Sequence, residues 1–286
     1  MTPAFVVEIT TPKKYRLNGL WFGPKKPKRV IVFIHGLTGS AFSGRRIVDA
    51  LVDTNTAVMT FNNRGHGVVN RLRVGERSVL GGGAHEVFTE SSDDIRGAVL
   101  FARRSGAKEI YIAGHSTGCQ KAVYYASKFK KRSLIRGLIL LGPVSDYAAA
   151  LKDDANGRLK KATALAKSLV RAGKKHVLLP SEMLTPWSVD DAQRFLSLYT
   201  PDSKETIFPY EQKGKVPRTL RSVAQPILVL WAAKDPYADR PAKDIAAWFT
   251  GNLKKHDKVV VVPRVEHGFK GGEKTVAAEV RRFMHS

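Results

Sequence analysis

The hydrophobic positions of this chain form short continuous runs, and the stretches between several of them carry apolar residues at helical spacing. The runs are Phe5–Ile9, Gly19–Phe22, Arg29–Ile34, Ala57–Phe61, Glu109–Ala113, Leu138–Leu141, Ile227–Trp231 and Lys258–Val262. Continuous apolar runs are typical of strands that are buried on both faces of a sheet. Buried strands that alternate with helices form right-handed βαβ units. The pattern therefore predicts an α/β fold with a mostly parallel central sheet and helices on both faces.

One block interrupts this alternation, because residues 146–222 contain no convincing strand. Its first predicted helix has one apolar face, made by Leu159, Ala162, Ala166, Leu169 and Val170. Its second predicted helix begins at Ser188, where Asp191 three residues later completes a capping pattern. The block lies between two predicted core strands. We therefore expect an inserted helical cap over 146–222 and a core made of residues 1–145 and 223–286.

The composition is that of a globular protein, with 286 residues, 43% hydrophobic and 26% charged. This balance excludes a disordered chain and a coiled coil, and the single cysteine excludes a disulfide framework. No apolar run approaches the ~18 residues that a membrane-spanning helix needs. The first residues lack the basic and apolar regions of a secretory signal. A cytoplasmic location without a membrane span is therefore expected.

The formal net charge of +23 is the most unusual global property of the chain. Lysine and arginine occur in nearly every segment and do not gather on one helix with interleaved aromatic residues. No nucleic-acid-binding motif accompanies them. We therefore expect weak adhesion to polyanions but no specific nucleic-acid partner, and the charge identifies no particular substrate.

The strongest chemical signal is the pentapeptide Gly114-His115-Ser116-Thr117-Gly118, which lies between a predicted strand and a predicted helix. In this context the Gly-x-Ser-x-Gly pattern predicts a tight turn, the nucleophile elbow, that exposes the Ser116 hydroxyl. The turn also directs the backbone N–H of Thr117 toward a developing oxyanion. His115 is a candidate substrate contact in the same turn.

A serine nucleophile needs a base, and the base needs an acid that orients it. His267 follows the last predicted strand, so its ring can reach the carboxyl edge of the sheet where Ser116 is expected. Asp235 follows the preceding strand and reaches the same edge, and Asp239 is the alternative acid in that loop. These positions predict a catalytic triad of Ser116, Asp235 and His267.

The loop after the first core strand, His35-Gly36-Leu37-Thr38, is positioned to complete an oxyanion hole. The N–H of Leu37 is the predicted donor, and Thr38 is both the alternative donor and a candidate substrate contact. We expect the ring of His35 to brace this loop by hydrogen bonding. In the cap, Trp187 contributes either to a small hydrophobic core or to a wall that binds the acyl or aryl part of a substrate.

Together these motifs resemble the serine hydrolases of the α/β-hydrolase fold, which share the chain order Ser, Asp, His. The strings GHSTGCQ (114–120), FNNRGHG (61–67) and RFLSL (194–198) further resemble the DUF1749 group, which includes fungal siderophore esterases. The resemblance implies hydrolysis of carboxylic esters or thioesters without a cofactor. It also implies that Arg64 and His66 are scaffold residues.

The expected function is hydrolysis of small to medium esters or thioesters through an acyl-enzyme, by a monomer or a homodimer. Acyl transfer, C–C bond hydrolysis or cofactor-free peroxidation on the same triad are alternatives. A non-catalytic module that binds a ligand or a polyanion is another. The sequence shows no metal-ligand spacing, and its Gly81-Gly82-Gly83 stretch lacks the lysine of a phosphate-binding loop. No metal and no cofactor are therefore predicted.

Overall fold

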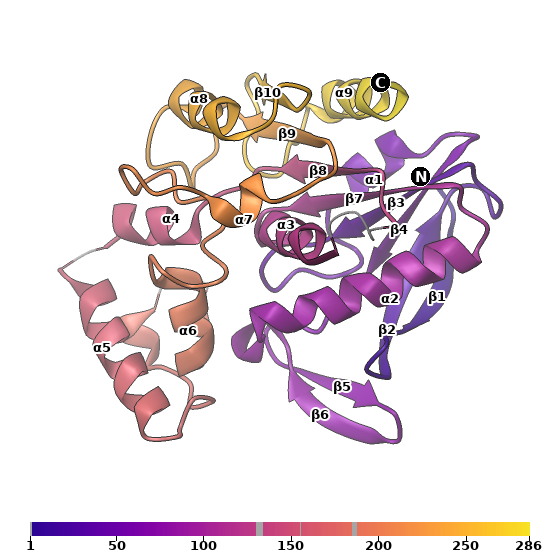
Figure 1. Cartoon of the computed structure of the whole chain (residues 1–286). Coiled ribbons are helices and arrows are strands. Elements are labelled where there is room, and N and C mark those ends of the chain that lie inside the picture. The colour runs from indigo at the N-terminus through magenta and orange to yellow at the C-terminus, as the bar shows by residue number, and fades with distance from the viewer. Residues whose placement is uncertain (1, 130–133, 155, 185–187) are drawn as a thin grey trace.

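The computed structural model describes residues 2–129, 134–154, 156–184 and 188–286. Its centre is a ten-stranded sheet in the order β10-β9-β8-β7-β3-β4-β2-β5-β6, with β1 paired to β2 (Figure 1). The strands are β1 (Ala4–Thr10), β2 (Tyr15–Phe22), β3 (Arg29–Ile34), β4 (Thr56–Phe61), β5 (Asn70–Val74), β6 (Arg77–Gly81), β7 (Glu109–His115), β8 (Gly137–Leu141), β9 (Ile227–Ala232) and β10 (Lys258–Val262). The six strands from β4 through β3, β7, β8 and β9 to β10 pair in parallel. This arrangement confirms the predicted mostly parallel sheet.

Helices cover both faces of the sheet. Helices α1 (Arg45–Leu51) and α9 (Glu273–His285) pack on one face, where Ile31 and Phe33 of β3 belong to their hydrophobic cluster. Helices α2 (Ser91–Arg104), α3 (Thr117–Phe129) and α8 (Ala242–Asn252) share a cluster on the other face with Val30, Val32 and Ile34. Both sets of β3 side chains are buried, which explains the continuous apolar run. Within the described residues, no helix has the length and apolar character needed to cross a membrane.

The hairpin of β5 and β6 was not predicted from the sequence, where this region reads as a polar, glycine-rich stretch. Four of the five β6 residues are exposed, and in β5 only Leu72 is buried. The hairpin extends the sheet beyond β2 at the bottom of Figure 1. A hairpin with so little buried surface leaves no alternation of apolar and polar positions to detect. The 3₁₀ helices η1 (Gly83–His85) and η2 (Phe88–Glu90) then lead into α2.

Between β8 and β9 the described chain is helical, in agreement with the lack of strand signals there. This stretch contains α4 (Asp146–Lys152), α5 (Arg158–Arg171), the 3₁₀ helix η4 (Ser181–Met183), α6 (Ala192–Tyr199) and α7 (Arg218–Arg221). Helices α5 and α6 lie to one side of the sheet, at the lower left of Figure 1. They enclose a small hydrophobic core of their own, in which Ala162, Ala166 and Phe195 are buried.

The start of α6 differs from the prediction. The helix begins at Ala192 and not at Ser188, and Asp191 is its N-cap. The Oδ1 atom of Asp191 accepts a hydrogen bond from the backbone N–H of Arg194 at 2.7 Å. The Ser188 hydroxyl instead donates to Asp190. Asp191 has an extended backbone and forms a β-bridge with Leu178, so residues before it cannot join the helix.

A buried arginine joins the end of β4 to the start of α2. The side chain of Arg64 is only 6% exposed and contacts Glu90, Asp93 and Asp94 at 3.0, 2.6 and 2.6 Å. Its guanidinium carbon also lies 3.9 Å from the centre of the Tyr15 ring. Burial raises the pKa of Asp94 to about 6, although Arg64 acts to lower it. These contacts fit the scaffold role that the family resemblance implies for Arg64.

Replacing Arg64 by methionine is expected to destabilise the fold by about 3–5 kcal/mol, because it leaves buried carboxylates without their cation. Urea denaturation measures the loss, and Arg16→Met, at an exposed pair with Glu8, is the matched control with an unchanged midpoint. The difference in unfolding free energy between the wild type and Arg64→Met should become smaller as pH falls. Without Arg64, the pKa of Asp94 is still higher, so its carboxylate binds a proton more readily. An Arg64→Met midpoint equal to that of the wild type would contradict the scaffold role.

Candidate active site

Ser116 stands at a sharp turn between β7 and α3. Its φ angle of +55° lies in the left-handed region, which is uncommon for a residue with a side chain. The backbone packs tightly on either side: a Cβ atom at Gly114 would lie 2.4 Å from the carbonyl oxygen of Gly118. A Cβ at Gly118 would lie 2.4 Å from the carbonyl oxygen of Ile34. The two glycines of the motif are therefore required by the close packing of the turn.

His267 and Asp235 meet at the carboxyl edge of the sheet. The Nδ1 atom of His267 lies 2.7 Å from Oδ2 of Asp235, whose side chain is fully buried. The other carboxylate oxygen accepts a hydrogen bond from the backbone N–H of Tyr237 at 3.0 Å. The Nε2 atom of His267 is buried and has no hydrogen-bond partner within the described residues. Asp239, the alternative acid, is paired with Arg240 at 2.7 Å.

Two neighbours hold the ring of His267 in place. His115 donates a hydrogen bond from Nε2 to the backbone oxygen of His267 at 3.0 Å, and the two rings are 4.8 Å apart. Burial, together with the nearby His267, lowers the pKa of His115 to about 4, so His115 is neutral near pH 7. The ring of Tyr237 meets His267 edge-on at 4.9 Å. The Nε2 hydrogen bond of His115 is therefore made to the loop that carries His267.

The loop after β3 lies directly against the serine, since a Cβ atom at Gly36 would be 2.8 Å from Cβ of Ser116. His35 donates from Nδ1 to the Gly36 carbonyl at 2.8 Å, which confirms the expected brace. Burial lowers the pKa of His35 to about 3 and keeps the ring neutral. In the same loop, Thr38 adopts a left-handed φ of +52°.

Two backbone amides beside Ser116 are without a hydrogen-bond partner among the described residues. Across the part of the chain that the structure describes, neither Leu37 N–H nor Thr117 N–H donates a hydrogen bond. Thr117 is also the first residue of α3, where the helix dipole favours negative charge. An arrangement of this kind can stabilise an oxyanion that forms at Ser116.

Ser116 and His267 line the same cavity of about 420 Å³, together with Leu37, Thr38 and His115. The structure thus brings these predicted site residues together, while Trp187 lies outside the described residues. The sequence analysis did not assign further lining residues to the site, among them Asp146, Asp153, Tyr199 and Tyr237. Asp146 and Asp153 are seven positions apart, and this helical spacing was the one available signal.

The charge of this cavity is opposite to that of the whole protein. Two carboxyl groups line it, and the lining described by the structure includes no lysine or arginine. Asp146 accepts a hydrogen bond from the Gln120 side chain at 2.8 Å. Burial, with Glu205 adding to it, raises the pKa of Asp146 to about 7, so this carboxyl group titrates near neutral pH.

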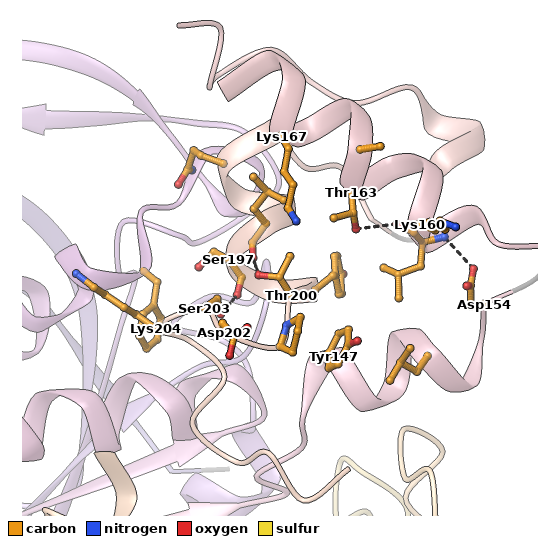
Figure 2. Close-up of a pocket in the computed structure, with 18 of the residues that line it drawn as sticks. Tyr147, Asp154, Lys160, Thr163, Lys167, Ser197, Thr200, Asp202, Ser203 and Lys204 are labelled. Atoms are coloured by element: carbon orange, nitrogen blue, oxygen red, sulfur yellow. Dashed lines mark hydrogen bonds between the residues drawn. The ribbon is translucent and has the colours of Figure 1, made fainter. Parts of the chain in front are cut away.

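A larger open groove of about 1000 Å³ lies between α4, α5 and α6 (Figure 2). Its charged lining is mostly basic, with Lys160, Lys167, Arg171 and Lys204. The hydroxyls of Thr163, Thr200 and Ser203 donate to backbone carbonyls, so they are already occupied. Tyr147 of α4 lines this groove and Asp146 lines the cavity that contains Ser116, while Tyr199 of α6 lines both. The groove contains none of the predicted catalytic residues.

Comparisons with known proteins agree with this architecture. A family model described as "Protein of unknown function (DUF1749)" matches residues 20–280, and no curated protein matches the chain. Est1E from Butyrivibrio proteoclasticus, solved with bound ferulic acid, has a TM-score of 0.64 and 18% identity, with 97% of each chain covered. The Pyrococcus furiosus esterase Pf2001 has a TM-score of 0.59 and 16% identity, with 99% of this chain and 92% of that chain covered. DcsB, in complex with a substrate analogue, has a TM-score of 0.68 and 14% identity, with 98% and 97% covered.

Proposed function

The chain belongs to the DUF1749 family and has the α/β-hydrolase fold, and on this premise we propose that it is a serine hydrolase of carboxylic esters or thioesters. One observation carries the proposal. A buried imidazole nitrogen without a partner, Nε2 of His267, borders the cavity that also contains Ser116, and Asp235 binds the opposite nitrogen. Among the solved structures of similar fold, Pf2001 is an esterase and Est1E binds ferulic acid, a carboxylic acid, which supports the same reaction class.

In the proposed mechanism, Nε2 of His267 takes the Ser116 proton while Oγ attacks the carbonyl carbon of the substrate. The N–H groups of Leu37 and Thr117 donate to the oxyanion of the tetrahedral intermediate. As the intermediate collapses, His267 gives its proton to the leaving alkoxide or thiolate, and the acyl group remains on Ser116. His267 then deprotonates a water molecule that attacks the acyl-enzyme, and it returns this proton to Oγ of Ser116 as the carboxylic acid leaves. Asp235 fixes the imidazole tautomer throughout.

Residues 146–222 act in this proposal as a cap that shapes the substrate cavity. Helix α4 supplies Asp146, its C-cap residue is Asp153, and α6 supplies Tyr199. The core contributes the residues around Ser116. A cavity of about 420 Å³ falls within the ~300–1,000 Å³ range of small-molecule sites, which suits small to medium esters. Because its charged lining is acidic, we expect neutral esters to be preferred over anionic ones.

The test is hydrolysis of a panel of p-nitrophenyl esters of increasing acyl length, acyl thioesters and methyl ferulate by the wild-type protein. One further p-nitrophenyl ester carries a terminal sulfonate, which stays ionised at every pH used. We expect turnover of the neutral esters, with kcat/KM at least about tenfold higher than for the sulfonate at equal length. Coulomb repulsion of about 2 kcal/mol at a separation of ~8 Å justifies this ratio. A folded protein that hydrolyses no member of the panel would reject the proposal.

Asp146→Asn tests the origin of the charge preference. The ratio of neutral to anionic kcat/KM should rise with pH through about 7 in the wild type, because the Asp146 carboxyl loses its proton there. The charges that act on Asp146 are Glu205, Asp190 and Arg194, all unchanged in the variant. The asparagine variant should show a lower ratio that stays constant with pH. Asp154→Asn, outside the catalytic cavity, is the matched control and should keep the wild-type profile.

A further inference from the structure

Three side chains from distant parts of the sequence meet away from the catalytic cavity. His85 belongs to η1, His176 lies in the loop after α5, and Asp191 is the N-cap of α6. The Nδ1 atoms of His85 and His176 lie 2.9 and 2.8 Å from the same atom, Oδ2 of Asp191. One donor atom from each of the three residues lies within 4.8 Å of the other two. Two imidazoles therefore converge on a single carboxylate oxygen.

The backbone around the cluster fixes its geometry. Asp191 is fully buried, and its Oδ1 is held by the N–H of Arg194, so Oδ2 is presented to both imidazoles. The N–H of Asp191 donates to the carbonyl of Ala84 at 2.8 Å, which anchors α6 to η1. The N–H of Ala192 donates to the carbonyl of Val177 at 3.0 Å, which anchors it to the loop of His176. The three side chains are thus preorganised by main-chain bonds.

We propose that His85, His176 and Asp191 form a binding site for a divalent transition-metal ion of the Zn²⁺ type. Two imidazole nitrogens and one carboxylate oxygen are the ligand set that such borderline ions accept, whereas Mg²⁺ and Ca²⁺ prefer oxygen ligands alone. The side chain of His176 is 51% exposed, which gives the ion access from solvent and leaves a position for water.

Zinc bonds of about 2.0–2.2 Å separate neighbouring ligand atoms of a tetrahedral site by about 3.3–3.5 Å. Each imidazole nitrogen therefore has to move away from Oδ2 by about 0.5 Å. The two nitrogens, which lie within 4.8 Å of each other, have to approach by up to about 1.4 Å. The metal takes the Nδ1 lone pair of each ring. A neutral ring that carries its proton on Nδ1 in the free protein therefore carries it on Nε2 in the complex, with no net loss of a proton.

The charge of the surroundings favours a bound cation. Ion pairs connect Lys121 to Glu86, Glu86 to Arg194, and Arg194 to Glu205, and all four side chains are buried. Asp190 and Asp191 adjoin this chain of ion pairs, so four carboxyl groups in these six residues face only two cations. A divalent ion at Asp191 offsets that excess of negative charge.

The proposed metal site links the core of the fold to the α5–α6 segment, and none of the proposed catalytic residues makes this link. His85 precedes α2 of the core, whereas His176 and Asp191 belong to the α5–α6 segment. None of the three residues lines the catalytic cavity. An ion bound here stabilises the docking of α5 and α6 without contact with Ser116. This inference stands independently of the proposed esterase activity.

The test uses tag-free full-length protein that has been treated with a chelator and dialysed. Co²⁺ is titrated first, because tetrahedral Co²⁺ gives intense visible absorption, and Zn²⁺ is then added to displace it. We expect one Co²⁺ per chain, loss of the absorption on addition of one equivalent of Zn²⁺, and a higher Tm with Zn²⁺ than without. Folded wild-type protein that shows no saturable binding and no Tm shift would overturn the site.

Variants assign the site to these residues. His176→Ala and Asp191→Asn should each weaken metal binding by at least about 100-fold, since even outer partners of metal ligands contribute 10–100-fold. Asn at position 191 keeps the helix cap, so its Tm without metal should stay close to that of the wild type. His256→Ala is the matched control, because His256 is 55% exposed beside Asp257 and should leave binding unchanged. The proposal would be overturned if His176→Ala bound the metal as tightly as the wild type, or if His256→Ala lost as much metal affinity as His176→Ala. Either result would show that the metal binds to surface histidines in general.

Discussion

Replacing Ser116 by alanine is expected to lower kcat/KM for ester hydrolysis by about 10⁶-fold, the scale seen when a serine hydrolase loses its nucleophile. The proposed reaction passes through an acyl group on Oγ, and alanine has no atom that can accept it. His267 and the amides of Leu37 and Thr117 remain in the variant. They can still polarise a bound ester, so a residual activity about 10³–10⁴-fold above the uncatalysed rate is expected to persist.

The fold should tolerate this change. The Ser116 hydroxyl makes no hydrogen bond with any described residue, and the backbone N–H bonds to the carbonyl of Leu141 at 3.0 Å whatever the side chain. Alanine and serine have similar difficulty with a φ of +55°. Ser116→Ala should therefore unfold at nearly the temperature of the wild type. A folded variant that retains more than a tenth of the wild-type kcat/KM would exclude Ser116 as the nucleophile.

Asp235→Asn is expected to lower kcat/KM by about 10⁴-fold, as found when the acid of such a triad becomes an amide. The carboxylate accepts the Nδ1 proton of His267, which keeps Nε2 free as a base. The asparagine amide can donate to Nδ1, and the ring proton then occupies Nε2, where it blocks attack by Ser116. The loss should appear mainly in kcat, because Asp235 does not line the substrate cavity.

Asp239→Asn is the matched control for this prediction. Asp239 lies in the same loop as Asp235, but its carboxylate is bound to Arg240 and does not contact His267. We expect its kcat to stay within a few-fold of the wild-type value. If Asp239→Asn caused the larger loss and Asp235→Asn the smaller one, the acid would have to be reassigned to Asp239.

The sequence predicted those parts of the structure that depend on local pattern. Buried parallel strands leave continuous apolar runs, so β3, β4, β7, β8 and β9 could be recognised. Residues that follow parallel strands meet at one edge of the sheet. This rule predicted that Ser116 and His267 lie at a common cavity and that Asp235 reaches His267.

Features that depend on tertiary packing left no such signal. The β5–β6 hairpin buries too little surface to produce a period-two pattern of apolar residues. The N-cap of α6 is Asp191 and not the predicted Ser188, because Asp191 forms a β-bridge with Leu178. The sequence indicates at most a shared helical face for Asp146 and Asp153, and it does not indicate that this face and Tyr199 line the cavity. His85, His176 and Asp191 have no regular spacing, so the sequence analysis, which predicted no metal, could not bring them together.

The central claim is that Ser116 is an activated nucleophile, and covalent labelling tests it most directly. The wild-type protein and Ser116→Ala are treated with a fluorophosphonate, which reacts with activated serines, and intact masses are then measured. The proposed mechanism predicts one adduct per wild-type chain, located at Ser116 by peptide mapping, and no adduct on Ser116→Ala. An unlabelled but folded wild-type protein, or equal labelling of both proteins at another residue, would contradict it.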